Sequence, residues 1–433
     1  MSILRRLSAF FPGRLAVADP TVTVLVVGAG STGLALAQGL KKANIPCIVV
    51  EKAASPDAHP RDWNMGLHWG ADALRALLPD EKWARIQSTQ VDPSTPTPET
   101  DSLEFLNGQT GELLNSIPAN SFYRLRRRKL RGLLAEDLDI RYSHALDNIT
   151  YSPDGESATA HFTNGSSITA SLIVGTDGAR STTRSLLLGP ENGLIRTLPY
   201  CATFIQARFP REKALFLRSF HPLYLASINP AGLFSFFGLH EIPDPDVPES
   251  WTFFFYISWY SSLAEQEETK GWSNQQRLQQ AKDFSRSFTV DPWKSAYEWL
   301  PDDQEVWYMS LTDFDPGQAN HRWENHDGRV TLAGDAAHAM TYQRGQGLNH
   351  SITDAAVLVK AIKEVVAGGK RRGDAVREYE TEMIGRAGEE VRMSTRNTEM
   401  VHDWGAVVKS PIMRRGMGRV GDDSHNDKGE GGK

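Results

Sequence analysis

The sequence predicts an α/β fold that combines a parallel sheet, an inserted antiparallel sheet and a long helix near the C-terminus. The chain opens with a β-branched run, a glycine-rich turn and a helix-forming stretch, which together make one βαβ unit. Two later apolar runs each end in a turn that contains Gly and Asp. The middle of the chain is rich in aromatic strand formers, and Asp374–His402 is typical of a long packing helix of mixed charge with a solvated face.

The first βαβ unit has its parts in the expected order. Val22–Val27 predicts a buried strand, Leu34–Ala43 a helix, and Pro46–Val50 a second strand that ends at Glu51. Between the first strand and the helix stand the glycines of the turn, Gly28, Gly30 and Gly33. This spacing is typical of a loop that binds the pyrophosphate of a dinucleotide.

Each residue type of this unit has a physical role in such a site. Gly28 permits the tight turn, Gly30 lets the backbone approach a pyrophosphate, and Gly33 lets helix and strand pack closely. The helix N-terminus supplies free N–H groups for phosphates. Glu51 can accept hydrogen bonds from a ribose diol, which favours FAD or NAD over NADP. The alternative is a glycine-rich connection that binds nothing.

Two further strand ends carry polar turns. Leu172–Gly175 runs into Asp177-Gly178, and Ser181 can cap the helix that follows. Gly328–Leu332 runs into Gly334-Asp335, followed by a glycine-rich loop and a helix over 348–366. Asp335 can accept a bond from a sugar-chain hydroxyl. The alternative interpretations are a common turn at Asp177 and, at the second strand end, a capping Asp335 beside a packed His338.

With the three motifs in this order, the chain resembles the FAD-dependent aromatic hydroxylases (flavin monooxygenases) of the para-hydroxybenzoate hydroxylase type, from about Val22 to Asp403. The resemblance implies a glutathione-reductase-like FAD-binding fold whose glycine loop holds the ADP half of FAD. It places Asp177-Gly178 near the pyrophosphate and links them to NAD(P)H, and it places Gly334-Asp335 at the ribityl chain and pyrophosphate. The loop residues implied near the isoalloxazine ring are Gly345, Gly347, Leu348 and Asn349.

One more position matches the family, Arg127, and two depart from it, Tyr342 and Asn64, the latter where the family usually has a Gly or Arg. Arg127 falls on the arginine that supports FAD, while most of the basic run 126–131 is expected to face solvent. Asn64 is the nearest match to a further FAD contact, with Arg61 as an alternative phosphate partner. Tyr342 stands where the family often has a proline near the flavin, and Arg344 follows two residues later. Tyr342 and Arg344 are therefore candidates for substrate contacts, since a cation stabilises a phenolate.

The resemblance divides the chain into segments. Strands are expected at Phe204–Phe209, Leu233–Leu239 and Trp251–Tyr260, and a helix at Trp272–Phe288. An aromatic face of this sheet can cover an aromatic substrate, although most of these side chains are expected in an ordinary core. The predicted segments are a disordered tail over 1–20, a first FAD-binding part over 21–190, a mainly β substrate part over 191–310, a second FAD-binding part with C-terminal helices over 311–405, and a tail over 406–433.

The function implied is a monooxygenase that uses FAD, NAD(P)H and O₂ to hydroxylate a phenolic or polyketide aromatic through a flavin C4a-hydroperoxide. The segments 61–69 and 343–350 resemble fungal members that tailor aromatic polyketides in secondary metabolism. Epoxidation, Baeyer–Villiger oxidation and a non-catalytic flavin-binding redox module remain alternatives, as does a nucleotide-binding regulator without flavin. A halogenase is excluded because the chain has no Trp-x-Trp-x-Ile stretch.

Composition limits the possible partners, metal sites and location of the protein. The 433 residues carry a net charge of −6, which argues against a dedicated nucleic-acid binder. The two cysteines, Cys47 and Cys201, have no disulfide or metal-ligand spacing, so we expect free thiols, no metal and a cytoplasmic location. An N-terminal organelle signal stays open, as does the oligomeric state. The glycines within the apolar stretch Val22–Leu40 favour strand–turn–helix over a membrane span.

Overall fold

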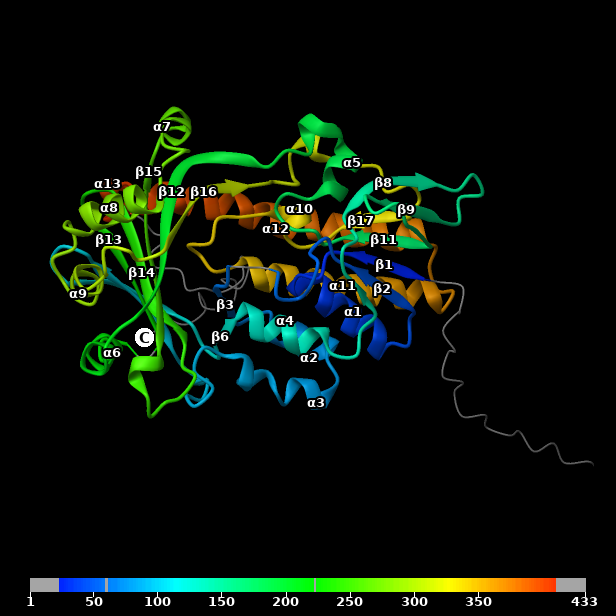
Figure 1. Cartoon of the computed structure of the whole chain (residues 1–433). Helices are drawn as coiled ribbons and strands as arrows, with labels where there is room; N and C mark the ends of the chain where they lie inside the picture. The colour runs from blue at the N-terminus through cyan, green and yellow to red at the C-terminus, as the bar shows by residue number, and fades with distance from the viewer. Residues whose placement is uncertain (1–22, 59–60, 222, 410–433) are drawn as a thin grey trace, which may run out of the picture.

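A computed structural model describes residues 23–58, 61–221 and 223–409 of the chain. Two bodies lie side by side, one around a five-stranded sheet and one around a seven-stranded sheet (Figure 1). The predicted tail 1–20 and residues 410–433 of the predicted tail 406–433 lie outside the described ranges.

The five-stranded sheet is parallel throughout and has the order β17-β11-β1-β2-β7. Side chains alternate along β1, so that Val24 and Val26 pack toward helices α1 and α11 on one face. Leu25 and Val27 pack on the opposite face against a small antiparallel sheet. The elements are β1 (Val24–Val27), α1 (Ser31–Lys42), β2 (Cys47–Val50), β7 (Ile140–Arg141), β11 (Leu172–Gly175), β17 (Val330–Leu332) and α11 (Gly347–Val366), with β8 (Leu146–Tyr151), β9 (Ala158–Phe162) and β10 (Ser167–Ala170) in the small sheet.

The seven-stranded sheet has the order β16-β12-β15-β14-β13-β4-β5. It is not wholly antiparallel as predicted, because β4 and β13 pair in parallel. A long crossover separates these two strands, and such a connection permits parallel pairing. The sheet also takes strands from outside the predicted segment 191–310, since β4 and β5 precede it. The strands are β4 (Ser102–Asn107), β5 (Leu113–Pro118), β12 (Arg196–Arg208), β13 (Tyr224–Asn229), β14 (Leu233–Glu241), β15 (Thr252–Tyr260) and β16 (Val306–Asp313).

A two-stranded antiparallel sheet, β3 (Asn64–Leu67) with β6 (Tyr123–Arg126), lies between the two bodies (Figure 1). Its register sets Asn64 opposite Arg126 and Gly66 opposite Arg124. Helix α4 (Arg127–Ala135) begins directly after β6. The β3–β6 pair and the start of α4 therefore lie next to both larger sheets.

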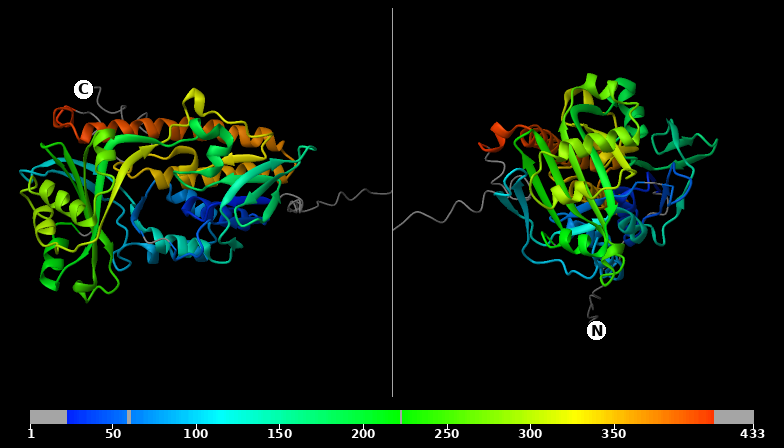
Figure 2. Two further views of the ribbon diagram at one scale, coloured as in Figure 1. Left: turned by 45° about the horizontal axis from the view of Figure 1, so that its top comes forward. Right: turned by 60° about the vertical axis from the view of Figure 1, so that its left-hand side comes forward.

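The predicted long helix is present as α12 (Arg372–Val401), and as predicted it packs against the rest of the protein while other side chains along it are exposed. Its first half buries residues such as Tyr379 and Met383 in the core beside α11. Its last turn buries Met400 and Val401 in the core of the seven-stranded sheet. Figure 2 shows this helix running along both bodies, so it connects them physically.

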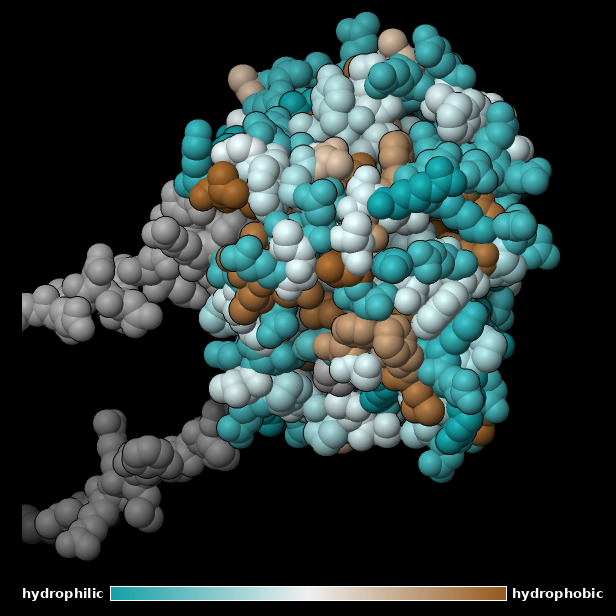
Figure 3. All heavy atoms as spheres, turned by 90° about the vertical axis from the view of Figure 1, so that its left-hand side faces the viewer, coloured by the Kyte–Doolittle hydropathy of each residue, from teal (hydrophilic) through white to brown (hydrophobic). Residues whose placement is uncertain are grey.

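The remaining helices cover the edges and outer faces. Figure 3 shows the outer face of the larger sheet's body, where apolar side chains gather in small groups between polar ones. The remaining helices are α2 (Ala71–Leu77), α3 (Asp80–Trp83), η1 (Ile86–Thr89), α5 (Thr182–Asn192), α6 (Arg211–Arg218), η2 (Pro248–Ser250), α7 (Leu263–Glu268), α8 (Asn274–Ser285), α9 (Trp293–Glu298), η3 (Ala319–His321), α10 (Asp335–His338) and α13 (Trp404–Val407).

Candidate functional site: a polar cleft beside an aromatic cavity

The glycine loop between β1 and α1 is shaped to admit a ligand. Gly28 has a φ of +112°, and a Cβ there would lie 2.6 Å from the carbonyl oxygen of Thr176. A Cβ on Gly33 would overlap the carbonyl oxygen of Gly28. A Cβ on Gly30, by contrast, would meet no atom closer than 4.0 Å. Gly28 and Gly33 are thus required by packing, whereas Gly30 leaves open space beside the backbone.

A polar cleft of about 170 Å³ opens at this loop. Helix α1 begins there at Gly30 without a side-chain cap and without an acidic residue in its first turn. The Glu51 carboxylate accepts from the backbone N–H groups of Ala29 and Ala53, both at 2.9 Å. An uncapped helix N-terminus suits an anion, and a carboxylate held by backbone keeps lone pairs for hydroxyl donors. These residues fit the pyrophosphate and ribose of a dinucleotide.

Two arginines of α4 line the same cleft. The Arg127 guanidinium lies 4.4 Å from the centre of the Trp63 ring, and burial lowers the pKa of Arg127 to about 10. It forms no ion pair with any described residue. Arg131 is buried and donates from Nε to the Ala29 carbonyl at 3.0 Å. Arg127 therefore supplies a positive charge that a phosphate can neutralise.

The prediction that most of the basic run 126–131 faces solvent is wrong. Arg126 pairs with Asp62 and Glu241, and Arg131 is buried against the glycine loop. Sequence reasoning missed Arg131 as a cleft residue. Its position four residues after Arg127 on one helix face was the available signal.

The Asp-Gly turn caps a helix and also borders the cleft. Asp177 accepts from the Ser181 hydroxyl at 2.5 Å and from the Thr183 N–H at 3.0 Å. Ser181 caps α5 by accepting from the Arg184 N–H at 2.9 Å, which confirms the predicted cap. Asp177 and Gly178 both line the polar cleft. The carboxylate of Asp177 therefore shapes the turn through its contacts with α5.

Arg184 connects the Asp177-Gly178 turn with the Gly334-Asp335 turn. Its guanidinium donates to the carbonyls of Ala179, Gly193 and Ala336 at 2.6, 2.9 and 2.9 Å. The same group lies 4.3 Å from the centre of the Phe314 ring, and burial lowers its pKa to about 10. One buried side chain thereby fixes the spacing between two turns that lie far apart in the sequence.

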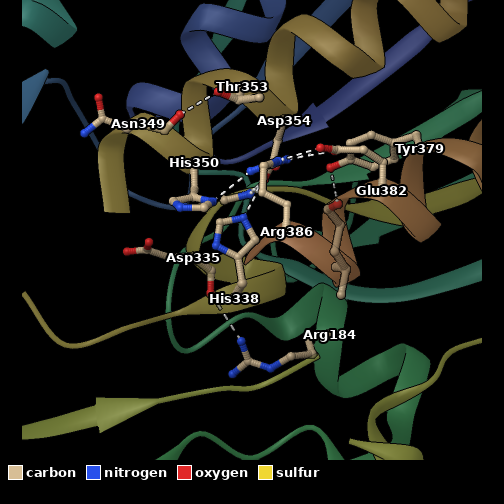
Figure 4. A network of polar contacts seen from close by, with 12 residues as sticks. Arg184, Asp335, His338, Asn349, His350, Thr353, Asp354, Tyr379, Glu382 and Arg386 are labelled. Atoms are coloured by element: carbon tan, nitrogen blue, oxygen red, sulfur yellow. Dashed lines mark hydrogen bonds and ion pairs between the residues drawn. The ribbon is translucent and has the colours of Figure 1, made fainter. Parts of the chain in front are cut away.

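The Gly-Asp turn is held by a network centred on Asp354 of α11 (Figure 4). Asp354 accepts from the Gly334 N–H at 2.8 Å and bonds His338 Nε2 at 2.6 Å and Arg386 at 2.7 Å. Burial alone raises the pKa of Asp354, but the charges of His338 and Arg386 lower it below its ordinary value. His338 is fully buried, which confirms its interpretation as a packed histidine.

Asp335 points away from this network (Figure 4). Its carboxylate has no hydrogen bond to any part of the chain that the structure describes, and it caps no helix. Its side chain is exposed at the border of a second, larger cavity, and desolvation by the surrounding protein raises the pKa of its carboxyl group. An acceptor in this position suits a hydroxyl donor of a ligand.

The larger cavity has a volume of about 330 Å³ and aromatic walls. Alternation along β15 turns Phe254 and Tyr256 toward it, while Phe253 and Phe255 pack in the core behind. Its aromatic lining consists of Phe122, Phe204, Tyr224, Phe234, Phe236, Phe254, Tyr256, Trp307, Tyr342 and Trp63.

The two substrate-side candidates both border this cavity. Tyr342 packs edge-on against Phe204 and Tyr256, with ring centroids 5.4 and 5.2 Å apart. Its buried hydroxyl finds no partner within the described residues, and burial raises its pKa. Arg344 donates from Nε to the buried Glu390 at 2.7 Å, so its charge is already paired.

The other predicted residues divide between the two cavities and their supports. Asn64 and Gly345 border the aromatic cavity, whereas Arg61 is exposed and borders neither. Asn349 is buried and bonds the backbone of four loop residues, accepting from His68 and Gly70 and donating to Gly66 and Gly345. Predicted residues that line neither cavity are Gly33, Gly334, Gly347, Leu348 and Asn349.

The cleft and the cavity adjoin. Gly178 borders the first and Ala179 the second, and Arg127 of the cleft covers Trp63 of the cavity. An elongated ligand in the cleft can therefore present one end to the aromatic walls. Within the described ranges no three His, Cys, Asp or Glu side chains group as a metal site, and no helix is long and apolar enough to cross a membrane.

Comparison with solved structures shows the fold. The chain superposes on 2,6-dihydroxypyridine-3-hydroxylase from Arthrobacter nicotinovorans with a TM-score of 0.69 at 18% identity, over 89% of this chain and 94% of that one. Klebsiella pneumoniae HpxO, complexed with FAD and uric acid, gives a TM-score of 0.68 at 18% identity, over 93% and 94%. The architecture is that of FAD-binding monooxygenases.

Sequence comparison shows the family. A model of an FAD binding domain matches residues 21–65 and 272–394. The FAD-dependent monooxygenase cctM of Talaromyces islandicus is 36% identical over 91% of this chain and 96% of its own length. The FAD-dependent monooxygenase phnB of Penicillium herquei is 33% identical over 92% and 96%. The chain belongs to this family of fungal FAD-dependent monooxygenases, which bind FAD.

Proposed function

We propose that this protein uses NAD(P)H and O₂ to hydroxylate a planar aromatic molecule of the phenol or polyketide class. The observation that carries the proposal is the aromatic cavity of about 330 Å³ directly beside the cofactor cleft. This volume lies at the lower end of the range for small-molecule sites, and apolar walls with few polar groups are typical of them. One structural relative, 2,6-dihydroxypyridine-3-hydroxylase, is by its name a hydroxylase, which supports the same chemistry.

In this proposal the cleft, together with Asp335 at the edge of the adjoining cavity, binds FAD part by part. The N-terminus of α1 and the Arg127 guanidinium hold the pyrophosphate, Glu51 accepts from the ribose diol, and Asp335 accepts from the ribityl chain. When bound, FAD supplies the redox and oxygen chemistry. The walls around Ala179 and Tyr342 exclude water and position the substrate. Asn349 and Arg184 set the spacing of the loops.

NAD(P)H binds transiently under this proposal, because the chain has no second glycine fingerprint. The test is a stopped-flow screen in which phenols and aromatic polyketides are mixed with the holoprotein and NADH or NADPH. We expect one class of aromatic to accelerate flavin reduction and to yield a product heavier by one oxygen atom, with the new hydroxyl on the ring. Reduction that no aromatic accelerates would contradict the proposal, as would a ring-expanded ester product.

A further inference from the structure

Arg124 of β6 is a buried cation in the wall of the aromatic cavity. It is 6% exposed, and its guanidinium lies 4.7 Å from the centre of the Phe236 ring and 5.7 Å from that of Tyr224. The register of β6 with β3 places it opposite Gly66, where the Phe122 ring occupies the space of the missing side chain. Neither composition nor motif singled it out.

Arg124 differs from its neighbours because no acid neutralises it. Among the described residues it forms no ion pair, and its Nη2 makes one hydrogen bond, to Asn64 Oδ1 at 3.3 Å. Its buried Nε has no partner. The adjacent Arg126 pairs with Asp62 and Glu241, and Arg344 across the cavity pairs with Glu390. Most of the N–H donors of the Arg124 guanidinium are thus unused.

A buried charge without a counter-ion is unfavourable, and aromatic faces compensate only part of the cost. Burial accordingly lowers the pKa of Arg124 to about 10, which still leaves the group charged at neutral pH. Asp335 is the acid that lines the cavity, but it lies near Arg127, Arg184 and His338 and does not pair with Arg124. The cavity therefore carries an uncompensated positive charge among rings that suit a planar ligand.

The same arrangement recurs at the cofactor. Arg127, three residues along the chain, also lies over an aromatic ring without an acid partner among the described residues, and it lines the FAD cleft. One short segment thus directs one unpaired guanidinium to each cavity. In the cleft, a phosphate of FAD can neutralise Arg127. In the aromatic cavity, the matching ligand for Arg124 is an aromatic molecule that carries an anionic group.

We propose that Arg124 binds an anionic oxygen, phenolate or carboxylate, of the planar aromatic substrate and so selects ionised over neutral substrates. This inference rests on the proposed function for the role of the cavity. Arg124 and the aromatic walls together form the recognition site, with the anion on the guanidinium and the ring against Phe236 and Tyr224.

The test measures binding of matched probes by quenching of tryptophan fluorescence, since Trp307 lines the cavity. The probes are 2-naphthoate with 2-naphthamide, and 4-nitrophenolate with 4-nitroanisole at mildly alkaline pH. The parent holoprotein should bind at least one anion more tightly than its neutral partner. Arg124→Met should weaken that anion by about 10- to 100-fold, and the neutral partner by less than about threefold. The probe pair with the larger difference in affinity between anion and neutral partner shows whether the site prefers a carboxylate or a phenolate.

Arg277→Met is the matched control, because Arg277 is also buried over aromatic rings, Trp272 and Tyr308, but lies outside the cavity lining. It should leave probe binding unchanged. Arg124→Lys keeps the charge and should restore part of the preference. Equal binding of anion and neutral partner by the parent protein would overturn the inference, as would unchanged anion binding in a folded, flavin-loaded Arg124→Met. Both results come from binding measurements and need no catalytic turnover. Failure of the Arg124 inference can therefore be told apart from failure of the hydroxylation proposal.

Discussion

The cofactor cleft and the aromatic cavity adjoin but are built by different means. The cleft combines backbone, namely a glycine turn and an uncapped helix N-terminus, with charged side chains, namely Glu51 held by two N–H groups and Arg127 of α4. The cavity is made mainly of side chains from β4, β12, β13, β14, β15 and β16 of one sheet. Backbone groups can bind a ligand whichever side chains the sequence carries, whereas side-chain walls change with each substitution. We therefore expect the cleft to fix the chemistry and the cavity to fix the substrate.

The strongest way to break the cleft alone is Gly30→Val. The added side chain enters open space, so the fold should persist, but it occupies the place of the pyrophosphate. We expect no measurable flavin after reconstitution at concentrations that saturate the parent protein. Flavin absorbance and a thermal melt measure both effects. Gly132→Ala is the control, since nothing lies within 4 Å of its added Cβ.

The ion pair of Arg344 tests whether this arginine belongs to the cavity or to the scaffold. Removal of the guanidinium leaves the buried Glu390 with only the Ser394 hydroxyl and His350 as polar neighbours among the described residues, so Arg344→Met should lower the free energy of unfolding by about 3 kcal/mol. The double variant Arg344→Met/Glu390→Gln should recover most of that loss in urea unfolding. If Arg344→Met is stable and instead loses substrate-stimulated NAD(P)H oxidation, Arg344 is a substrate contact.

Arg184 tests the connection between the two cavities. Arg184→Met leaves three carbonyls without their donor and should cost about 2–3 kcal/mol of unfolding free energy. Flavin affinity should fall as well, because the second and third motifs lose their spacing. Arg180→Met, an exposed neighbour in the same turn, should change stability by less than about 0.5 kcal/mol.

Asp335 gives the smallest expected effect, and it depends on pH. Its pKa is raised by desolvation above the ordinary value of 3.8, so the folded protein holds the proton more tightly than the unfolded chain. The contribution to stability is therefore full below that value and is lost as pH rises through the raised pKa. The flavin-free Asp335→Asn variant should be more stable than its parent at neutral pH, and the difference should vanish in acid. A difference that is constant with pH would contradict this.

The cleft could be predicted from the sequence because its constraints are local. A positive φ at Gly28, a close contact at Gly33 and a cap at Ser181 each act within a few residues of the motif. The cavity could not be predicted because its parts meet only through strand register. Arg124 becomes a wall residue through the pairing of β6 with β3, and the partner of Arg344 lies on α12. The parallel β4–β13 pair was unpredictable for the same reason.

The central claim is that one FAD molecule occupies the cleft and presents its ring to the aromatic cavity. The crystal structure of the flavin-loaded protein tests it most directly. We predict the adenosine beside Glu51, the pyrophosphate at the start of α1, and the isoalloxazine ring between Ala179 and Tyr342. A ring turned away from the aromatic walls, or a flavin bound outside the cleft, would contradict this claim.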